Sequence, residues 1–148
     1  MPRRLLILGP SFRRNEGESL TAFERYSGVY FRVAKKHLKH TCDVDVVVMT
    51  DDLVLTDDSS SLPYVPPEGD VWGNQSFPKD ILEDAKRRNY VFLMRKLKSE
   101  EYSEVFIAMG RKHAKALPDL SCYDFRLVFP TLGGLGPKAR ALKEWILR

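Results

Sequence analysis

Four short apolar runs, separated by amphipathic segments, set the pattern of this 148-residue chain. They cover residues 4–9, 44–50, 105–109 and 125–130 and consist mainly of Leu, Ile, Val and Phe. Continuous apolar runs of this length are typical of strands that are covered on both faces, as in a parallel sheet. The pattern therefore predicts an α/β fold, a three-layer sandwich in which a central, mostly parallel four-stranded sheet has helices on both faces.

The segments between these strands predict helices. Over residues 27–39, apolar side chains recur at i, i+3, i+4 and i+8, basic side chains occupy the other faces, and Ser27 is a suitable N-cap. Pro78 is expected to begin a second helix, in which the polar stretch 87–89 leaves open a kink or two consecutive helices. A short helix after Gly110 and a C-terminal helix after a glycine-rich turn complete the alternation.

Alternation of strands and helices predicts right-handed crossovers and the strand order 2-1-3-4, numbered along the chain. In this order the chain reverses direction between the first and third strands, and ligands bind outside the carboxyl ends of strands at such a point. We therefore expect one ligand site formed by polar residues that follow the strands. These residues are Ser11, Arg13, Arg14, Asp51, Asp52, Arg111, His113, Thr131, Gly133, Gly134, Gly136 and Lys138.

The composition of this set indicates an anion site. Arginine offers paired donors to phosphate or carboxylate, and a glycine-rich turn before a helix brings backbone N–H groups close to an anion. The turn GGLGPK matches neither GxGxxG nor GxxxxGK[ST], so an ordinary strand-to-helix turn stays open as the alternative. A catalytic set would need Ser11 or Thr131 beside His113, and the sequence does not show that contact.

The longest irregular segment, residues 57–77, contains Tyr64, Trp72 and Phe77. Large aromatic side chains are costly to leave in water, so they are expected to hold the segment in place, with Tyr64 or Trp72 substantially buried. The alternative is that they cover a flat ligand such as a nucleobase.

Charge and cysteine content narrow the functional classes only a little. The net charge of +4, from 24 basic and 20 acidic residues, allows a polyanionic partner without requiring one. No apolar run is long enough for a signal peptide or a membrane span, so a cytoplasmic protein of one domain, residues 1–148, is expected.

Cys42 and Cys122 are expected to be buried thiols, because neither belongs to a CxxC pair that would suit zinc. No metal and no cofactor is predicted. One Gln and three Asn beside 30% charged residues hint at a thermophile, in which a Cys42–Cys122 disulfide stays open.

Several motifs together resemble a family of small uncharacterised α/β domains. They are GPSFRR after the first strand, YSGVYFRVA before and within the next helix, a Pro-Tyr pair after the second strand, and GGLG before the last helix. The clearest matches are Tyr26, Gly28, Phe31, Gly134 and Gly136. That family is similar in fold to uracil-DNA glycosylases, and related domains occur as modules of archaeal tRNA-guanine transglycosylase relatives that take part in archaeosine formation.

The resemblance implies a pocket at the strand ends that accepts a nucleobase or nucleic acid, with Tyr26 among the site residues. It does not carry over an activity. Uracil-DNA glycosylases use an acidic motif after the first strand and a histidine-containing motif after the last, where this chain has GPSFRR and PTLGGLG.

Two functional hypotheses follow. In the first, the chain binds a nucleotide, nucleobase or nucleic acid, with arginines on the phosphate and an aromatic ring on the base. In the second, it is a non-catalytic module whose aromatic segment docks a protein partner or a second copy of the chain. Phosphate-driven binding weakens steeply as salt rises, whereas an apolar interface does not.

Overall fold

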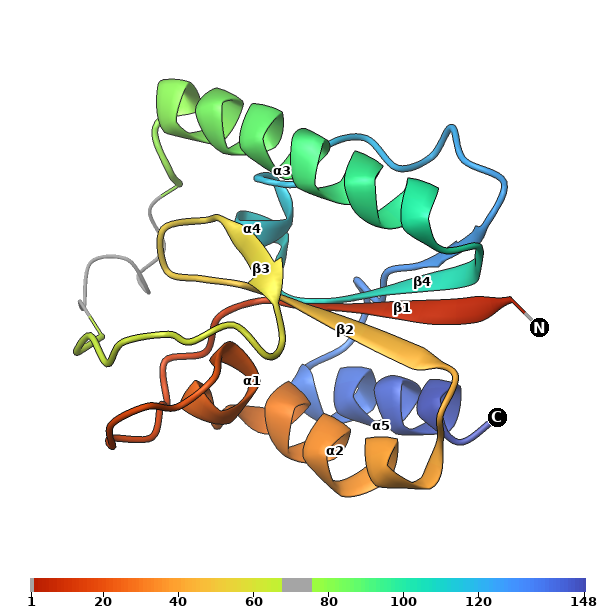
Figure 1. Cartoon of the computed structure of the whole chain (residues 1–148), viewed down its shortest axis with the longest axis horizontal. Helices are drawn as coiled ribbons and strands as arrows, with labels where there is room; N and C mark the ends of the chain where they lie inside the picture. Colours follow the sequence, from red (N-terminus) through yellow and green to blue (C-terminus); the bar gives the residue numbers. More distant parts are fainter. Residues whose placement is uncertain (1, 68–75) are drawn as a thin grey trace.

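A computed structural model describes residues 2–67 and 76–148 and contains a five-stranded sheet, in the order β3-β2-β1-β4-β5 (Figure 1). The strands are β1 Arg3–Leu8, β2 Val44–Met49, β3 Leu55–Asp57, β4 Tyr102–Ala108 and β5 Arg126–Val128. β1 pairs in parallel with β2 and β4, and β4 with β5, whereas β3 is antiparallel to β2. The α/β class and the order of the four expected strands are confirmed, but the sheet is mixed and has five strands rather than four.

The missed strand β3 is short and depends on tertiary contacts. A tight turn places Leu53 at a φ of 64° and returns the chain against β2. Buried Asn89 accepts a hydrogen bond from the Leu55 N–H (2.9 Å) and donates to the carbonyl oxygens of Leu53 (2.8 Å) and Ala116 (2.9 Å). A three-residue strand shows no readable alternation, and its polar partner lies 34 residues away in the chain.

The helices are α1 Ala22–Arg25, α2 Val29–His37, α3 Lys79–Ser99, α4 Arg111–Ala114 and α5 Leu135–Ile146, with a 3₁₀ turn at Leu38–His40. The N-cap of α2 is Gly28 rather than the expected Ser27, and no side chain caps this helix. α3 is one continuous helix of 21 residues, because Asn89 in its polar stretch is satisfied by the contacts described above. The sequence prediction also missed α1, whose capping box joins Thr21 and Glu24.

Helices cover both faces of the sheet (Figure 1). On one face, Leu5, Ile7 and Val47 form a buried cluster with α3 residues such as Leu93. On the other, Leu6, Leu8 and Val48 pack with Phe31 of α2 and Trp145 of α5. This alternation along β1 follows from the strand period of two, and it makes β1 the centre of both clusters.

α2 and α5 pack against each other on one face, and both begin at the carboxyl edge of the sheet (Figure 1). At the opposite end, buried Arg4 donates to the carbonyl oxygens of Trp145 and Ile146 in the last turn of α5 and pairs with Asp43 (2.9 Å). A cation on the last carbonyl groups of a helix interacts favourably with the helix dipole. This contact fixes α5 relative to β1, and therefore fixes where α5 begins.

The prediction for the segment after β3 named Tyr64 or Trp72 as a substantially buried residue. Tyr64 is 37% exposed and does not supply that burial, and Trp72 lies outside the described residues. Phe77 packs against the buried core, and backbone hydrogen bonds also hold the segment: the N–H of Ala22 donates to the carbonyl oxygen of Ser60 (2.8 Å), and that of Leu62 donates to the carbonyl oxygen of Leu20 (3.0 Å). Irregular backbone can thus be ordered by pairing with another loop, which local sequence does not reveal.

The two cysteines are free and exposed, which corrects the expectation of buried thiols. Cys42 belongs to the turn before β2 and Cys122 to the segment before β5, where the chain crosses the surface. Of the helices in residues 2–67 and 76–148, none combines the length and apolar character needed to cross a bilayer.

Candidate functional site

Among the described residues, the carboxyl edge of the sheet has at least two separate recesses where the sequence predicted a single crevice. One, which we name the α2 pocket, lies between the end of β1, the beginning of α2 and the end of β4. The other is a small cavity of about 80 Å³ around Arg14, Tyr26 and Asp51. Arg13 and Arg14 are adjacent in the chain but line different recesses, which divides the predicted site.

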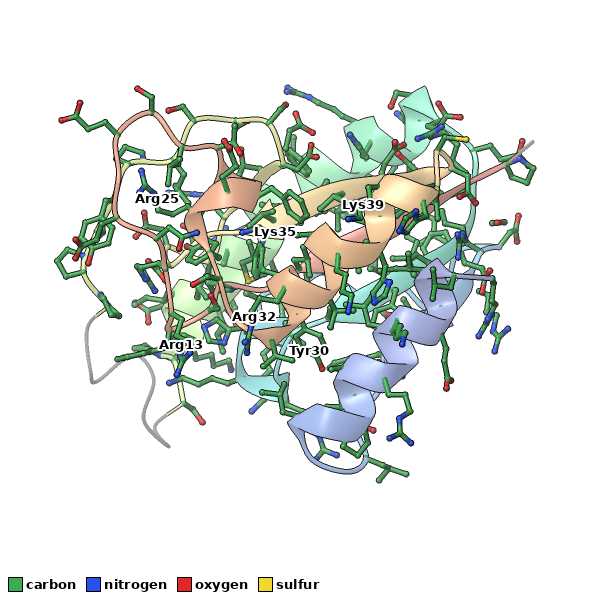
Figure 2. All side chains as sticks on the ribbon, turned by 90° about the horizontal axis from the view of Figure 1, so that it is seen from below. Arg13, Arg25, Tyr30, Arg32, Lys35 and Lys39 are labelled. Atoms are coloured by element: carbon green, nitrogen blue, oxygen red, sulfur yellow. The ribbon has the colours of Figure 1, made fainter. Side chains whose placement is uncertain are left out.

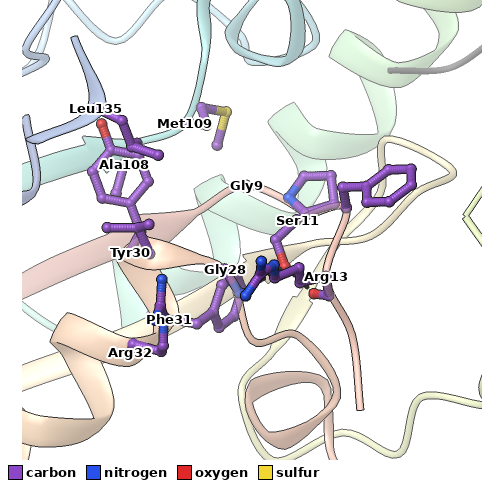
Figure 3. Close-up of a pocket in the computed structure, with 13 residues that line it drawn as sticks. Gly9, Ser11, Arg13, Gly28, Tyr30, Phe31, Arg32, Ala108, Met109 and Leu135 are labelled. Carbon is purple, nitrogen blue, oxygen red and sulfur yellow. Dashed lines mark hydrogen bonds between the residues drawn. The ribbon is translucent and has the colours of Figure 1, made fainter. Parts of the chain in front are cut away.

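The α2 pocket has a volume of about 480 Å³, within the usual range for a small-molecule site (Figure 3). Its described lining is mostly apolar, with polar groups from only four side chains. The lining residues are Gly9, Pro10, Ser11, Phe12, Arg13, Gly28, Val29, Tyr30, Phe31, Arg32, Ala108, Met109 and Leu135. None of these is Asp, Glu, His, Cys or Lys, and the polar side chains of the described lining are Ser11, Tyr30 and the two arginines.

Two glycines shape the pocket by allowing close approach. A Cβ on Gly28 would lie 2.5 Å from the Cβ of Ser11, and a Cβ on Gly9 would collide with the Cβ of Met109. Gly28 has an ordinary φ of −66°, so space and not backbone conformation requires glycine there. The Gly9–Ser11 loop is thereby packed directly on the first residue of the α2 turn.

At the beginning of α2, three backbone N–H groups have no acceptor among residues 2–67 and 76–148. The Gly28 N–H donates to the Ser11 hydroxyl (3.1 Å), which itself donates to the carbonyl oxygen of Arg13 (2.5 Å). The next three N–H groups, of Val29, Tyr30 and Phe31, have no intrahelical acceptor, because the first helical bond runs from Arg32 to Gly28. The first turn contains no acidic residue to compete for these donors. An anion at this end of α2 would meet both the N–H groups and the positive end of the helix dipole.

Arg13 and Arg32 add positive charge to the same pocket. Both side chains are exposed, and within residues 2–67 and 76–148 neither forms an ion pair with a carboxylate. Figure 3 shows Arg13 beside Ser11 and Gly28, and Tyr30 beside Ala108 and Leu135. Tyr30 is half-buried, and burial raises the pKa of its hydroxyl. The pocket therefore combines two cations with an aromatic ring and apolar walls.

Arg14 has a different role from its neighbour. Only 3% of its side chain is exposed, and it forms an ion pair with Asp51. Its remaining donors reach the carbonyl oxygens of Phe12 (3.3 Å), Ser11 (2.8 Å) and Val65 (3.1 Å). Together with the two contacts to Asp51, all five guanidinium N–H positions have acceptors. No donor is left for a ligand.

Arg25 and Tyr26 complete what we name the Arg14–Arg25 network. Buried Arg25 donates to the carbonyl oxygens of Leu62 (2.9 Å), Asn15 (2.8 Å) and Gly17 (2.9 Å). The ring of Tyr26 lies under the Arg14 guanidinium at 5.2 Å, and its hydroxyl accepts from the Asp51 N–H (3.2 Å). Burial is the main reason that the pKa of this hydroxyl is raised. The network ties the loop after β1 to the loops after β2 and β3.

The other predicted residues lie outside the lining of the α2 pocket. His113 is buried on α4, where burial, followed by the charge of Lys112, lowers its pKa to about 4, opposed by Asp51. Arg111 donates to the carbonyl oxygen of Thr131 (3.2 Å) and so braces the turn before α5. The described pocket lining includes Leu135, the first residue of α5, and no residue of the turn itself. The remaining predicted residues, Gly133, Gly134, Gly136 and Lys138, are absent from the lining.

Sequence reasoning missed Tyr30, Arg32, Met109 and Leu135 as pocket residues. Tyr30 and Arg32 were attributed to the two faces of an amphipathic helix, which is where helical periodicity places them. A usable signal was present: α2 begins after a glycine N-cap and has no acidic residue in its first turn. Those features predict that the beginning of the helix, and not only the loop before it, belongs to the site.

Comparisons with protein-family models, curated proteins and solved structures find no match to this chain. The motif resemblance to domains of the uracil-DNA glycosylase type therefore stays a prediction, and the candidate site is defined by the geometry of the α2 pocket.

Proposed function

We propose that the chain is a three-layer α/β sandwich that binds a nucleotide in the α2 pocket, with the phosphate at the beginning of α2 and the base against Tyr30. The observation that carries this proposal is the convergence, on one pocket of about 480 Å³, of an uncapped helix N-terminus and two arginines. The motif resemblance indicates the same class of ligand.

Phosphate is the anion that suits these donors. Three consecutive N–H groups at the beginning of α2 and the forked donors of Arg13 and Arg32 supply several hydrogen bonds to one tetrahedral group. Clustering two arginines without a carboxylate partner costs repulsion, which a dianionic ligand would remove. A carboxylate ligand would use fewer of these donors.

The apolar part of the pocket suits a flat ring. Tyr30, Leu135 and Met109 bound it, and their side chains offer contact area with few polar groups. Base–aromatic stacking contributes about 1–3 kcal/mol per base. Such contacts tolerate different bases, so discrimination among the four bases is expected to be modest.

Calorimetric titration with the four ribonucleoside monophosphates, the matching nucleosides and inorganic phosphate tests the proposal. The monophosphates are expected to bind more tightly than either fragment, because only they use both parts of the pocket. Arg13→Ala and Arg32→Ala are each expected to weaken monophosphate binding by about tenfold, the loss of one charge-assisted hydrogen bond.

Arg95→Ala provides the matched control, because Arg95 is an exposed arginine of α3 on the opposite face of the sheet. It is expected to bind like the parent. The proposal is wrong if no monophosphate binds the parent protein, or if the Arg95 variant loses as much affinity as the Arg13 variant.

A further inference from the structure

The helices beside the pocket carry a strong excess of positive charge. Residues 28–40 and 134–148 contain eight basic residues and one acidic residue, which leaves 16 basic and 19 acidic residues elsewhere. α3, on the other face, has seven basic residues but also three acidic ones. Two of its cations, Arg88 and Lys96, are already in ion pairs, with Asp84 and Asp57.

The exposed cations of α2 and α5 form one surface, which we name the basic face. It consists of Arg32, Lys36, Lys39, Arg140 and Lys143, all exposed and all without an ion pair to the described carboxylates. α2 and α5 pack together, and the pKa of His37, the last residue of α2, is lowered first by desolvation and then by Lys143 of α5 and by Lys36. The cations of the two helices therefore act on the same region of space.

The basic face is continuous with the α2 pocket. Arg32 belongs to both, and Figure 2 shows Arg13 and Arg32 near the beginning of α2 with Lys39 at its far end. Arg32, Lys36 and Lys39 lie at i, i+4 and i+7, so they follow one side of the helix over a rise of about 10 Å. A chain of phosphates that leaves the pocket over α2 would therefore pass along a row of cations.

We propose that the basic face binds the backbone phosphates of a single-stranded nucleic acid, one nucleotide of which occupies the α2 pocket. This inference rests on the proposed nucleotide site and adds the polymer to it. A single strand fits better than a duplex, because a nucleotide inside the pocket must be unstacked, and unpairing it from a duplex adds a cost of a few kcal/mol. The basic face alone would suit any polyanion. Because Arg32 belongs to both the basic face and the proposed nucleotide pocket, a polymer of nucleotides is the polyanion that uses both.

Fluorescence anisotropy with a labelled single-stranded 12-mer of mixed sequence, measured over a range of salt concentrations, tests the inference. The face variant Lys36→Gln/Lys39→Gln/Lys143→Gln is expected to reduce the slope of log K against log salt by about 2, from about 0.7 for each lost phosphate contact. The control variant Lys86→Gln/Arg87→Gln/Arg95→Gln removes the same charge from exposed positions of α3 and is expected to keep the parent slope.

Monophosphate binding separates the two proposals, because none of the three face lysines lines the pocket. The face variant is expected to bind monophosphates like the parent but the 12-mer more weakly, and in the parent the 12-mer should displace a bound monophosphate. If the parent binds monophosphates but the 12-mer no more tightly, or if the α3 control loses as much, the basic-face inference is overturned and the pocket stands. If the parent binds no monophosphate, the nucleotide site itself fails. Face-dependent binding to anionic phospholipid vesicles without 12-mer binding would also overturn the inference.

Discussion

Arg13 and Arg14 are consecutive arginines in one loop, yet they serve two regions with opposite requirements. Arg14 is 3% exposed and has an acceptor for every guanidinium N–H, whereas Arg13 is exposed on the α2 pocket and has no described ion-pair partner. The difference shows how a loop can be rigid and still present a binding group. The Arg14–Arg25 network fixes the backbone, and the fixed backbone holds Arg13 and Ser11 at the beginning of α2.

This division of labour changes what substitutions should do. A sequence-based view would treat the pair as one anion site, so that replacing both arginines leaves the fold intact. In the structure, replacing Arg14 would leave Asp51 without its ion-pair partner and three carbonyl oxygens without their hydrogen-bond donor. Only the Arg13 substitution is expected to report on binding alone.

Arg14→Ala is expected to have the largest effect on stability. Removing one partner of a buried ion pair costs about 3–5 kcal/mol, and the partial exposure of Asp51 places this case near the lower value. Urea unfolding followed by circular dichroism gives the change in the free energy of unfolding. A loss below about 1 kcal/mol would mean that the network does not hold the loop.

His113 is expected to make the free energy of unfolding depend on pH. Its pKa of about 4 lies below the ordinary value near 6.5, so between these values the unfolded chain binds a proton more readily than the folded one. The free energy of unfolding is therefore not reduced by His113 above about pH 6.5. It decreases as the pH falls towards 4, and protonation of this group lowers it by at most about 3 kcal/mol. Unfolding at pH 7 and pH 4.5 should show a smaller difference for His113→Gln than for the parent, and an equal difference would contradict the assignment.

Gly28→Ala is expected to destabilise the loop on the pocket side by about 1–3 kcal/mol, the usual cost of overpacking. The added Cβ would lie 2.5 Å from the Cβ of Ser11. Ser11→Gly removes that Cβ, so the double variant should recover part of the stability lost in Gly28→Ala. Independent, additive losses from the two changes would show that the two residues do not touch in solution.

Arg13→Ala is expected to have the smallest effect on stability, within about 0.5 kcal/mol of the parent, because the side chain is exposed. Its effect on monophosphate affinity should nevertheless be clear. The contrast with Arg14→Ala, measured under identical unfolding conditions, tests whether adjacent arginines really have separate roles. Equal destabilisation by both substitutions would remove the distinction.

Most of the sheet could be predicted from the sequence because buried strands are recognised by continuous apolar runs, as at Leu5–Leu8 and Val105–Ala108. It failed where partners are distant in the chain. β3 is held by Asn89 through the Leu55 N–H, and Arg14 is kept away from the ligand site by its pairing with Asp51, 37 residues further along the chain. Topology correctly brought Ser11 and Arg13 to the carboxyl edge, but only three-dimensional geometry separates the residues that line the α2 pocket from those that brace its loop.

The most direct test is a backbone amide NMR titration of the parent protein with a ribonucleoside monophosphate. We expect saturable shifts centred on Gly9–Arg13, Val29–Arg32 and Leu135, with the N–H groups of Val29, Tyr30 and Phe31 shifting most because they face the phosphate. Small or no shifts are expected at Asp51, whose N–H is bound to the hydroxyl of Tyr26. Saturable shifts centred on Asp51 or on α3, or no saturable shift at all, would contradict the assignment of the nucleotide site to the α2 pocket.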